Sequence, residues 1–197
     1  MNEIDLPEDN FVIDIKDFNL SYNSVVLFNH FNFQVKKGQC AGIFGPTGTG
    51  KTSLLNKIVE DYLKKENISY IFQDNKLIED LSVFENIFIP LKNKFPKTEA
   101  EKRASFFIKK LNLVSKKNEK VKVLSGGEKQ RVNIARAFAY PRSLLLMDEP
   151  FSAQDSENKK NIINMTKKIC NDNNITSVIV SHERDDLNSL CDFIIDF

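Results

Sequence analysis

Three short segments of this chain combine glycine, lysine and carboxylate residues in patterns that suit phosphate chemistry. The first is GPTGTGKT at 45–52, a full match to the P-loop pattern, in which glycines let backbone N–H groups point at phosphate oxygens. The second is LSGGE at 124–128, where the first amides of a helix can face an anion. The third is LLLMDE at 144–149, which reads as a buried strand that ends in two carboxylates. A P-loop alone indicates nucleotide binding, and the other two segments narrow that prediction.

The P-loop segment supplies most of the predicted nucleotide contacts. Lys51 can reach the β- and γ-phosphates, and the Thr52 hydroxyl suits a Mg²⁺ ligand in the pattern of P-loop NTPases. A chance glycine-rich turn is disfavoured, because an apolar strand pattern precedes the loop and an amphipathic helix pattern follows it. The residues predicted to contact the nucleotide here are Gly45, Pro46, Thr47, Gly48, Thr49, Gly50, Lys51, Thr52 and Ser53.

The two acidic residues at the end of the third segment have different predicted roles. Asp148 is at the carboxyl end of the strand, where a carboxylate can hold Mg²⁺ through water. Glu149 would point toward the γ-phosphate and polarise the attacking water as a general base. The alternative is a strand that ends in two solvated acids. This alternative is disfavoured because Pro150 stops the strand and the SAQD segment at 152–155 follows.

Together these segments resemble the ATP-binding cassette (ABC) ATPases, and the resemblance covers nearly the whole chain. It implies that Gln73, after an apolar strand pattern, is the Q-loop glutamine that contacts Mg²⁺ and water and senses a membrane partner. His182 matches the switch histidine at the γ-phosphate. Tyr22 matches the aromatic residue that stacks on adenine, although Phe18 or Phe28 could serve instead. The implied catalytic residues are Glu149, His182, Gln73 and Lys51, and the implied metal ligands are Thr52, Gln73 and Asp148.

The resemblance also implies that the chain works as a dimer. In this family the serine and glycines of the LSGGE segment close over the ATP held by the P-loop of a second subunit. Each chain therefore has two half-sites, and hydrolysis requires two subunits, either two copies of this chain or this chain and a paralogous cassette. The residues concerned here are Ser125, Gly126 and Gly127, and Ser125 can also cap the helix that follows.

The segment at 152–155 matches the D-loop, which crosses the dimer interface in this family. Asp155 is included among the implied nucleotide-binding residues. The usual residue at the third position is leucine, and here it is Gln154, a departure that concerns communication across the interface more than hydrolysis. Arg131, one turn along the helix from the glycine pair, is interpreted as a structural charge partner with no direct catalytic role.

The apolar pattern predicts an α/β fold: a P-loop NTPase core with a mostly parallel sheet, an N-terminal antiparallel β-subdomain and a helical insertion. The whole chain, 1–197, is predicted to form a single ABC ATPase domain. Its parts are the β-subdomain at 11–36, the core at 39–76 and 126–197, and the helical subdomain at 77–125. Strands are expected at 11–20, 25–28, 31–35, 39–44, 68–72, 143–147 and 175–180. Helices are expected after Lys51, with Leu54, Leu55, Ile58, Tyr62 and Leu63 on one face, and at 99–113, from Gly126 onward and at 158–170.

Composition excludes several other classes of protein. The net charge is +1 over 197 residues, so the chain has no strong positive electrostatic potential to attract nucleic acid or an anionic membrane. No nucleic-acid partner is expected. No apolar run approaches the roughly 20 residues needed to cross a bilayer. The stretch at 1–9 is acidic and polar, which rules out a secretory signal. The three cysteines are scattered, which fits a reduced compartment: they are Cys40, Cys170 and Cys191.

The resemblance implies an ATPase subunit that dimerises on ATP and powers solute transport through a separate membrane permease. Its expected location is peripheral, on the cytoplasmic face of the inner membrane. The segments FQDNKL at 72–77 and MDEPFSA at 147–153 look like bacterial importers, so import is favoured, with a solute-binding protein as a further candidate partner. Apolar residues at 81–91 either line a groove for the permease or form the core. The end of the chain at Phe197, soon after His182, suggests a minimal cassette.

Two other functions are alternatives to transport. The first is an ABC-type ATPase of the cell-division or lipoprotein-release kind, which regulates a membrane protein without moving a solute. No residue separates it from a transporter, because both need the same ATP chemistry. The second is a P-loop kinase, which is disfavoured because the segment 125–128 and His182 would have no role in it.

Overall fold

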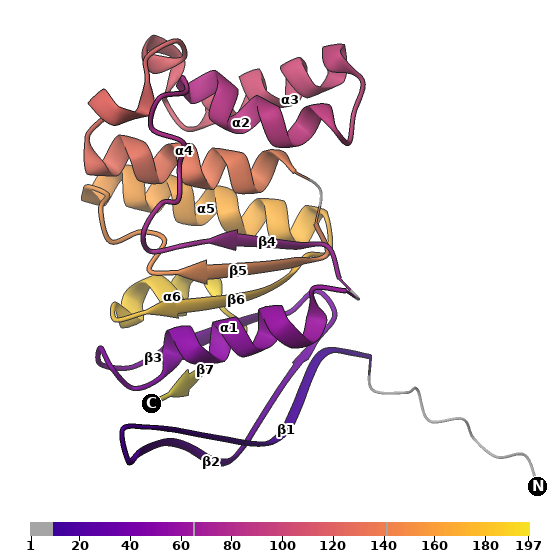
Figure 1. The fold of residues 1–197 in the computed structure, drawn as a ribbon, viewed down its shortest axis with the longest axis vertical. Coiled ribbons are helices and arrows are strands. Elements are labelled where there is room, and N and C mark those ends of the chain that lie inside the picture. Colours follow the sequence, from indigo (N-terminus) through magenta and orange to yellow (C-terminus); the bar gives the residue numbers. More distant parts are fainter. Residues whose placement is uncertain (1–9, 65, 141) are drawn as a thin grey trace, which may run out of the picture.

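The computed structural model describes residues 10–64, 66–140 and 142–197. The acidic stretch at 1–9, on which the argument against a secretory signal depends, lies outside these residues. The described part of the chain forms a five-stranded parallel sheet, a two-stranded antiparallel sheet and several helices (Figure 1). The predicted α/β fold with a mostly parallel sheet is confirmed.

The parallel sheet brings the carboxyl ends of its strands to one edge. Its strand order is β4-β5-β6-β3-β7, and β5 and β6 are buried along their whole length, as expected when both faces of a parallel sheet are covered. The strands are β3 (Cys40–Phe44), β4 (Ile68–Ile71), β5 (Leu144–Asp148), β6 (Thr176–Ser181) and β7 (Phe193–Asp196). The four strands predicted for this sheet differ from β3 to β6 by no more than one residue at either end.

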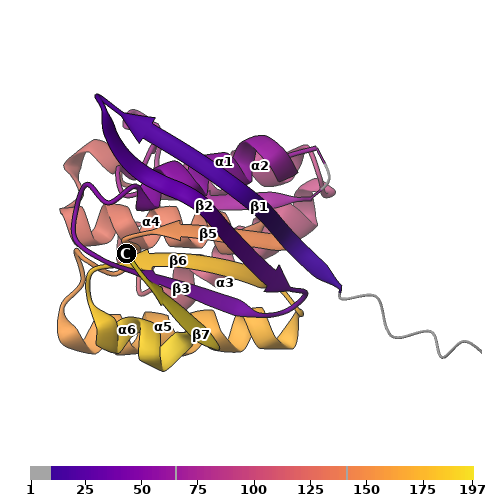
Figure 2. The same ribbon diagram turned by 90° about the horizontal axis from the view of Figure 1, so that it is seen from below.

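Helices cover both faces of this sheet. α1 (Lys51–Tyr62) shares one face with the antiparallel strands, and α5 and α6 lie on the other (Figure 2). The helices of this second side are α4 (Gly126–Ala139), α5 (Ser156–Asp172) and α6 (Arg184–Leu190). α2 (Val83–Lys92) and α3 (Lys97–Lys110) pack on α4, and the 3₁₀ turns η1 (Val114–Lys116) and η2 (Val121–Val123) follow α3. Within the described ranges no helix is long and apolar enough to span a bilayer.

Alternate side chains of β5 point into two separate cores. Leu144 and Leu146 join the core under α1, whereas Leu145 and Met147 join the core that contains α4, α5 and α6. Successive side chains of a strand point to opposite faces, so a strand of continuous apolar residues can anchor helices on both sides. This double anchoring holds the end of β5, and with it Asp148, in place.

The antiparallel sheet differs from the prediction in one respect. It consists of two long strands, β1 (Phe11–Tyr22) and β2 (Val25–Lys36), where the sequence pattern predicted a break between 25–28 and 31–35. Asp17 and His30 have φ angles of 53° and 49°, and the register shifts around them. Such bulges keep the ladder continuous while they interrupt the alternation of apolar residues, and the sequence pattern therefore predicts two strands where the structure has one.

The sequence pattern does not predict helix α2, because a proline at position 90 indicates a break there. The helix begins at a capping box, in which the Ser82 hydroxyl accepts from Glu85 N–H and the Glu85 carboxylate accepts from Ser82 N–H. Pro90 lies in the last turn of the helix, which ends two residues later. The pattern of serine followed three residues later by glutamate was the available sequence signal for this helix.

The apolar stretch at 81–91 divides between the two roles considered for it. Val83, Ile87 and Leu91 are fully buried, so one face of α2 belongs to the core. Phe84 and Phe88 are half-buried on the adjacent face, with their rings stacked at 5.2 Å between centroids. Val83, Ile87 and Leu91 therefore belong to the core. The rings of Phe84 and Phe88 form an aromatic surface on α2.

Two further differences concern the ends of elements. Leu63, predicted to share the apolar face of α1, caps the carboxyl end of that helix and is 61% exposed. The other four residues predicted for that face are buried or half-buried. α6 and β7 were not predicted, because a helix of seven residues and a strand of four are too short to give a clear period.

Candidate active site

A cavity of about 440 Å³ lies at the carboxyl edge of the parallel sheet. Its volume is in the range of pockets that hold small ligands and cofactors. Most of the residues that line it were predicted as site residues from the sequence, whereas Leu27 and Ser152 were not. The lining residues are Tyr22, Leu27, Thr47, Gly48, Gly50, Lys51, Thr52, Ser53, Gln73, Asp148, Glu149, Ser152 and His182.

The loop before α1 has the backbone geometry of an anion-binding site. Gly48 and Gly50 have φ angles of 89° and 96°, which side chains rarely adopt, and a Cβ on Gly50 would lie 2.8 Å from the Phe28 ring. Among the described residues, no side chain caps the N-terminus of α1. The first amides of the helix and its positive dipole end therefore face the cavity together, which favours phosphate.

Lys51 is held against the loop that precedes it. Its ammonium nitrogen donates to the carbonyl oxygens of Gly45 at 2.7 Å and Pro46 at 2.5 Å, and the side chain is almost completely buried. Thr49 adds a hydroxyl bond to the Pro46 carbonyl at 3.0 Å. A lysine ammonium has three donors, so one remains for a phosphate oxygen while two fix the charge at the mouth of the loop.

Thr52 and Asp148 meet at the position predicted for the metal. The Thr52 hydroxyl donates to the Asp148 carboxylate at 2.8 Å, although the two residues come from α1 and the end of β5. Burial raises the pKa of Asp148 above its ordinary value, and the Thr52 bond and the Lys51 charge offset only part of this. A hydroxyl and a carboxylate are the hard oxygen ligands that Mg²⁺ prefers, and a cation beside Asp148 would compensate its burial. The donor set fits Mg²⁺.

Glu149 and His182 form the second pair in the cavity. Glu149 Oε2 lies 2.9 Å from His182 Nδ1, and the carboxyl side chain is 12% exposed. The backbone of Glu149 has a φ of 47°, a left-handed conformation that is uncommon for residues other than glycine. Its N–H donates to the Val180 carbonyl of β6 at 3.0 Å, which anchors this conformation to the neighbouring strand. Such strained residues cluster at functional sites.

Tyr22 and Gln73 complete the wall of the cavity. Tyr22 ends β1 and is 70% exposed, so its ring is accessible for stacking. The two alternatives to it are in a different environment: Phe28 is 5% exposed, and Phe18 packs on it at 5.1 Å between ring centroids. Leu27, which sequence reasoning missed, is the neighbour of Phe28 on β2, and no local motif distinguishes it from other apolar strand residues.

The other predicted nucleotide-binding residues do not line this cavity in the described part of the chain. Ser125 caps α4 by accepting from Glu128 N–H at 3.3 Å, as predicted, and Asp155 caps α5 by accepting from Asn158 N–H at 3.0 Å. Apart from its chain neighbours and the backbone of its own helix, no described atom lies within 4 Å of the position that a Cβ on Gly126 would occupy, so this turn has an open surface. Ser125 and Asp155 are both exposed, and neither is among the residues that line the cavity.

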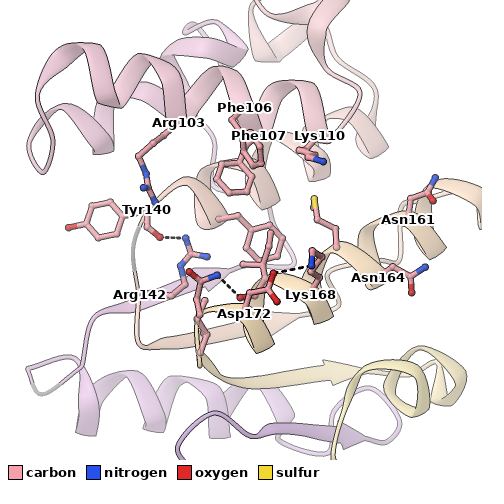
Figure 3. A pocket seen from close by; sticks show the side chains of 15 residues that line it. Arg103, Phe106, Phe107, Lys110, Tyr140, Arg142, Asn161, Asn164, Lys168 and Asp172 are labelled. Atoms are coloured by element: carbon pink, nitrogen blue, oxygen red, sulfur yellow. Dashed lines mark hydrogen bonds and ion pairs between the residues drawn. The ribbon is translucent and has the colours of Figure 1, made fainter.

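A second cavity, of about 750 Å³, lies near the amino ends of β5 and β6, between α3 and α5. Figure 3 shows Arg103, Tyr140, Arg142 and Lys168 around it, with Lys168 paired to Asp172. Burial lowers the pKa of Arg142 to about 9. Among the described residues that line this cavity there is neither a phosphate-binding loop nor a pair of metal-ligating acids. Although it is the larger of the two, it does not have the chemistry of a nucleotide site.

Several known proteins resemble this chain in sequence. A family model described as "ABC transporter" matches residues 28–152. The methionine import ATP-binding protein MetN of Francisella tularensis subsp. holarctica (strain OSU18) is 32% identical over 201 residues, which cover 90% of this chain and 57% of the relative. MetN of Clostridioides difficile (strain 630) is 32% identical over 205 residues, which cover 91% of this chain and 64% of the relative. The chain thus spans less than two thirds of the length of either relative.

A solved structure extends the similarity to three dimensions. The dimeric structure of a post-hydrolysis state of the ATP-binding cassette MJ0796, bound to ADP and Pi, has a TM-score of 0.84 with this chain. The two are 29% identical in sequence, and the match covers 93% of each chain. The fold is therefore shared with a cassette that is dimeric in that structure.

Proposed function

This chain belongs to the ABC transporter family, and on that basis we propose that it is the ATP-hydrolysing subunit of a membrane transporter, active as a dimer beneath a separate permease. One observation supports the ATPase activity most directly. Lys51, Thr52, Asp148, Glu149 and His182 come from separate segments and line a single cavity beside an uncapped helix N-terminus. Phosphoryl transfer depends on positioning and charge neutralisation, and these residues supply both.

The proposed reaction is hydrolysis of ATP to ADP and phosphate. Tyr22 stacks on adenine, the loop amides and Lys51 bind the β- and γ-phosphates, and Thr52, Asp148 and Gln73 hold Mg²⁺. The bound metal would neutralise charge on the phosphate oxygens. Glu149 accepts the proton of the attacking water, and its carboxylate is oriented by the 2.9 Å contact with His182. His182 is 57% exposed at the mouth of the cavity, where it can also donate to the γ-phosphate.

The proposed dimer follows from the residues at the start of α4, which do not line the P-loop cavity. The start of α4 is open at Gly126 and lies outside the wall of the P-loop cavity. A helix N-terminus of this kind can bind a phosphate, and the partner subunit's ATP is the ligand that the family resemblance implies. The second subunit is either a copy of this chain or a paralogous cassette.

The proposed partners at the membrane are a permease and, for an importer, a solute-binding protein. The half-buried rings of Phe84 and Phe88 give α2 an apolar surface for a permease segment, close in sequence to Gln73. Both MetN relatives are named for import, which favours import as the direction of transport. The chain would then be peripheral on the cytoplasmic face of the inner membrane, with 77–125 as the helical subdomain and 39–76 with 126–197 as the core.

Two measurements test this proposal. Purified protein should release phosphate from ATP in a Mg²⁺-dependent manner, and no release by the dimeric protein would contradict the ATPase assignment. An affinity pull-down from mild-detergent membranes, followed by mass spectrometry, should recover a permease with several membrane spans. Recovery of a single-span protein with no translocation path would contradict transport and favour the regulator.

A further inference from the structure

Gln154 connects the loop after β5 to the start of helix α4 through both ends of its side-chain amide. Its Nε2 donates to the carbonyl oxygen of Gly127 at 3.0 Å, and its Oε1 accepts from Arg131 Nη1 at 3.1 Å. Arg131 had been interpreted as a charge partner, but this contact is to a neutral amide. The two bonds reach the first and second turns of α4, so a single side chain spans the beginning of that helix.

Two further contacts bring the same loop and helix together. The buried Gln130 side chain donates from Nε2 to the Pro150 carbonyl at 3.0 Å. A Cβ on Gly127 would lie 2.8 Å from the Ala153 carbonyl oxygen, so the backbone approaches too closely for any side chain there. The loop that follows Glu149 therefore packs directly on the helix that begins at Ser125.

The Arg131 end of this connection is enclosed. Among the described residues, Arg131 Nε is buried and has no hydrogen-bond partner. A cavity of about 20 Å³, lined in part by Arg131 and Asn158, adjoins it. That space is large enough for one water molecule, which could satisfy Nε. A partly buried guanidinium needs acceptors, and Gln154 Oε1 is one that leucine could not provide.

We propose that Gln154 is a positioning residue that fastens the loop after Glu149 to the start of α4, so that the two half-sites of one subunit move together. Glu149 belongs to the subunit's own P-loop cavity, and Ser125–Gly127 face the nucleotide of the partner subunit. This inference depends on the proposed function, because it assigns a consequence to the dimer. Leucine, the usual residue here in the resembling family, would form neither hydrogen bond and would leave the two elements joined by packing and Gln130 alone.

The test is ATP-dependent dimerisation in a Glu149→Gln background, which removes hydrolysis from the measurement. We expect Gln154→Leu to weaken the dimer about tenfold, the scale of one hydrogen bond to a charged group, and to leave ATP binding by the monomer unchanged. Arg131→Met should weaken it to a similar degree. The double variant should be no weaker than the worse single variant, because both changes break the same connection.

Controls separate this role from a general effect on folding. Lys160→Leu adds leucine at an exposed position of the nearby helix α5 and should leave the dimer unchanged. Gln154→Glu keeps an acceptor for Arg131 but loses the donor to Gly127, so it should restore part of the affinity lost in Gln154→Leu. An unchanged or tighter Gln154→Leu dimer, or additive effects of the two single changes, would overturn the proposal.

A failure of the proposed function gives a different result. If the Glu149→Gln protein does not dimerise with ATP at all, the cross-subunit site is wrong. The proposed coupling of half-sites is then wrong as well. The free energies of unfolding of the Gln154→Leu, Arg131→Met and double variants, measured in urea, would still report the contact between the two side chains. If the Glu149→Gln protein dimerises and the Gln154 variants dimerise as tightly as it does, the dimer is supported and the positioning role is wrong.

Discussion

The Glu149 carboxylate lies 2.9 Å from Nδ1 of His182, at the carboxyl ends of the adjacent parallel strands β5 and β6. Neither residue is part of a local motif that includes the other. The register of the two strands pairs Asp148 with Val180, so the residues that follow these strands emerge side by side. The strained backbone of Glu149 then turns its side chain into the cavity, where the histidine can orient it.

Replacing Glu149 with glutamine should slow hydrolysis and preserve ATP binding. Glutamine keeps the size of the side chain but cannot accept a proton from water, and losing a general base typically costs about 10²–10⁴-fold in rate. Phosphate release and equilibrium ATP binding are the two measurements. Turnover of Glu149→Gln near the wild-type rate would show that Glu149 is not the general base.

Replacing Ser125 with arginine should abolish ATP-dependent dimerisation while the monomer still binds ATP. The change puts a long cation at the proposed cross-subunit surface and removes a helix cap, whose loss alone costs about 1 kcal/mol. Ser82→Arg is the matched control, because Ser82 caps a different helix, α2, with the same kind of capping box. Gel filtration of both variants in the Glu149→Gln background measures the dimer. A dimer that persists in Ser125→Arg would refute the cross-subunit site.

Replacing Thr52 with valine should raise the Mg²⁺ concentration needed for half-maximal ATPase activity. The variant keeps the shape of the side chain and loses the hydroxyl beside Asp148, and we expect a shift of about tenfold or more, since even outer-shell changes alter metal affinity on that scale. Thr166→Val is the control, since it removes a buried hydroxyl bond within α5 at a residue that does not line the cavity. Equal Mg²⁺ dependence of the two variants would contradict the metal role of Thr52.

Asp148→Asn should stabilise the nucleotide-free protein at neutral pH. Burial raises the folded-state pKa of Asp148, so the folded state binds its proton more tightly than the unfolded state does. Stability from this group is therefore present at low pH and is lost as the pH rises from the unfolded pKa through the folded one. The gain in free energy of unfolding from Asp148→Asn should shrink as the pH falls toward 4. Urea unfolding at several pH values measures this, and a gain that does not depend on pH would contradict it.

Tyr22→Ala should weaken ATP binding, whereas Tyr22→Phe should retain most of it. The exposed ring supplies a stacking surface, and stacking of a base on an aromatic side chain is worth about 1–3 kcal/mol. Fluorescence titration with a labelled ATP gives the dissociation constants. Equal ATP affinity of Tyr22→Ala and wild type would mean that another residue makes the adenine contact.

Much of the fold followed from local patterns. The continuous apolar runs of the buried strands and the glycine spacing before Lys51 are formed by residues close together in the chain, so a short window of sequence contains the whole signal. Local rules also failed at identifiable places. Pro90 predicts a break, although the last turn of α2 accommodates it. The bulge at His30 interrupts the apolar alternation of a strand that is continuous in the structure.

The sequence by itself determined the residue types of the site: the P-loop, the acidic pair at the end of β5 and the glycine pair at the start of α4. Only the tertiary structure decided which of them meet. It paired Thr52 with Asp148 and Glu149 with His182, and it joined Gln154 to Gly127 and Arg131. Those distances depend on strand order, register and the packing of helices on the sheet, which are non-local properties that no short segment encodes.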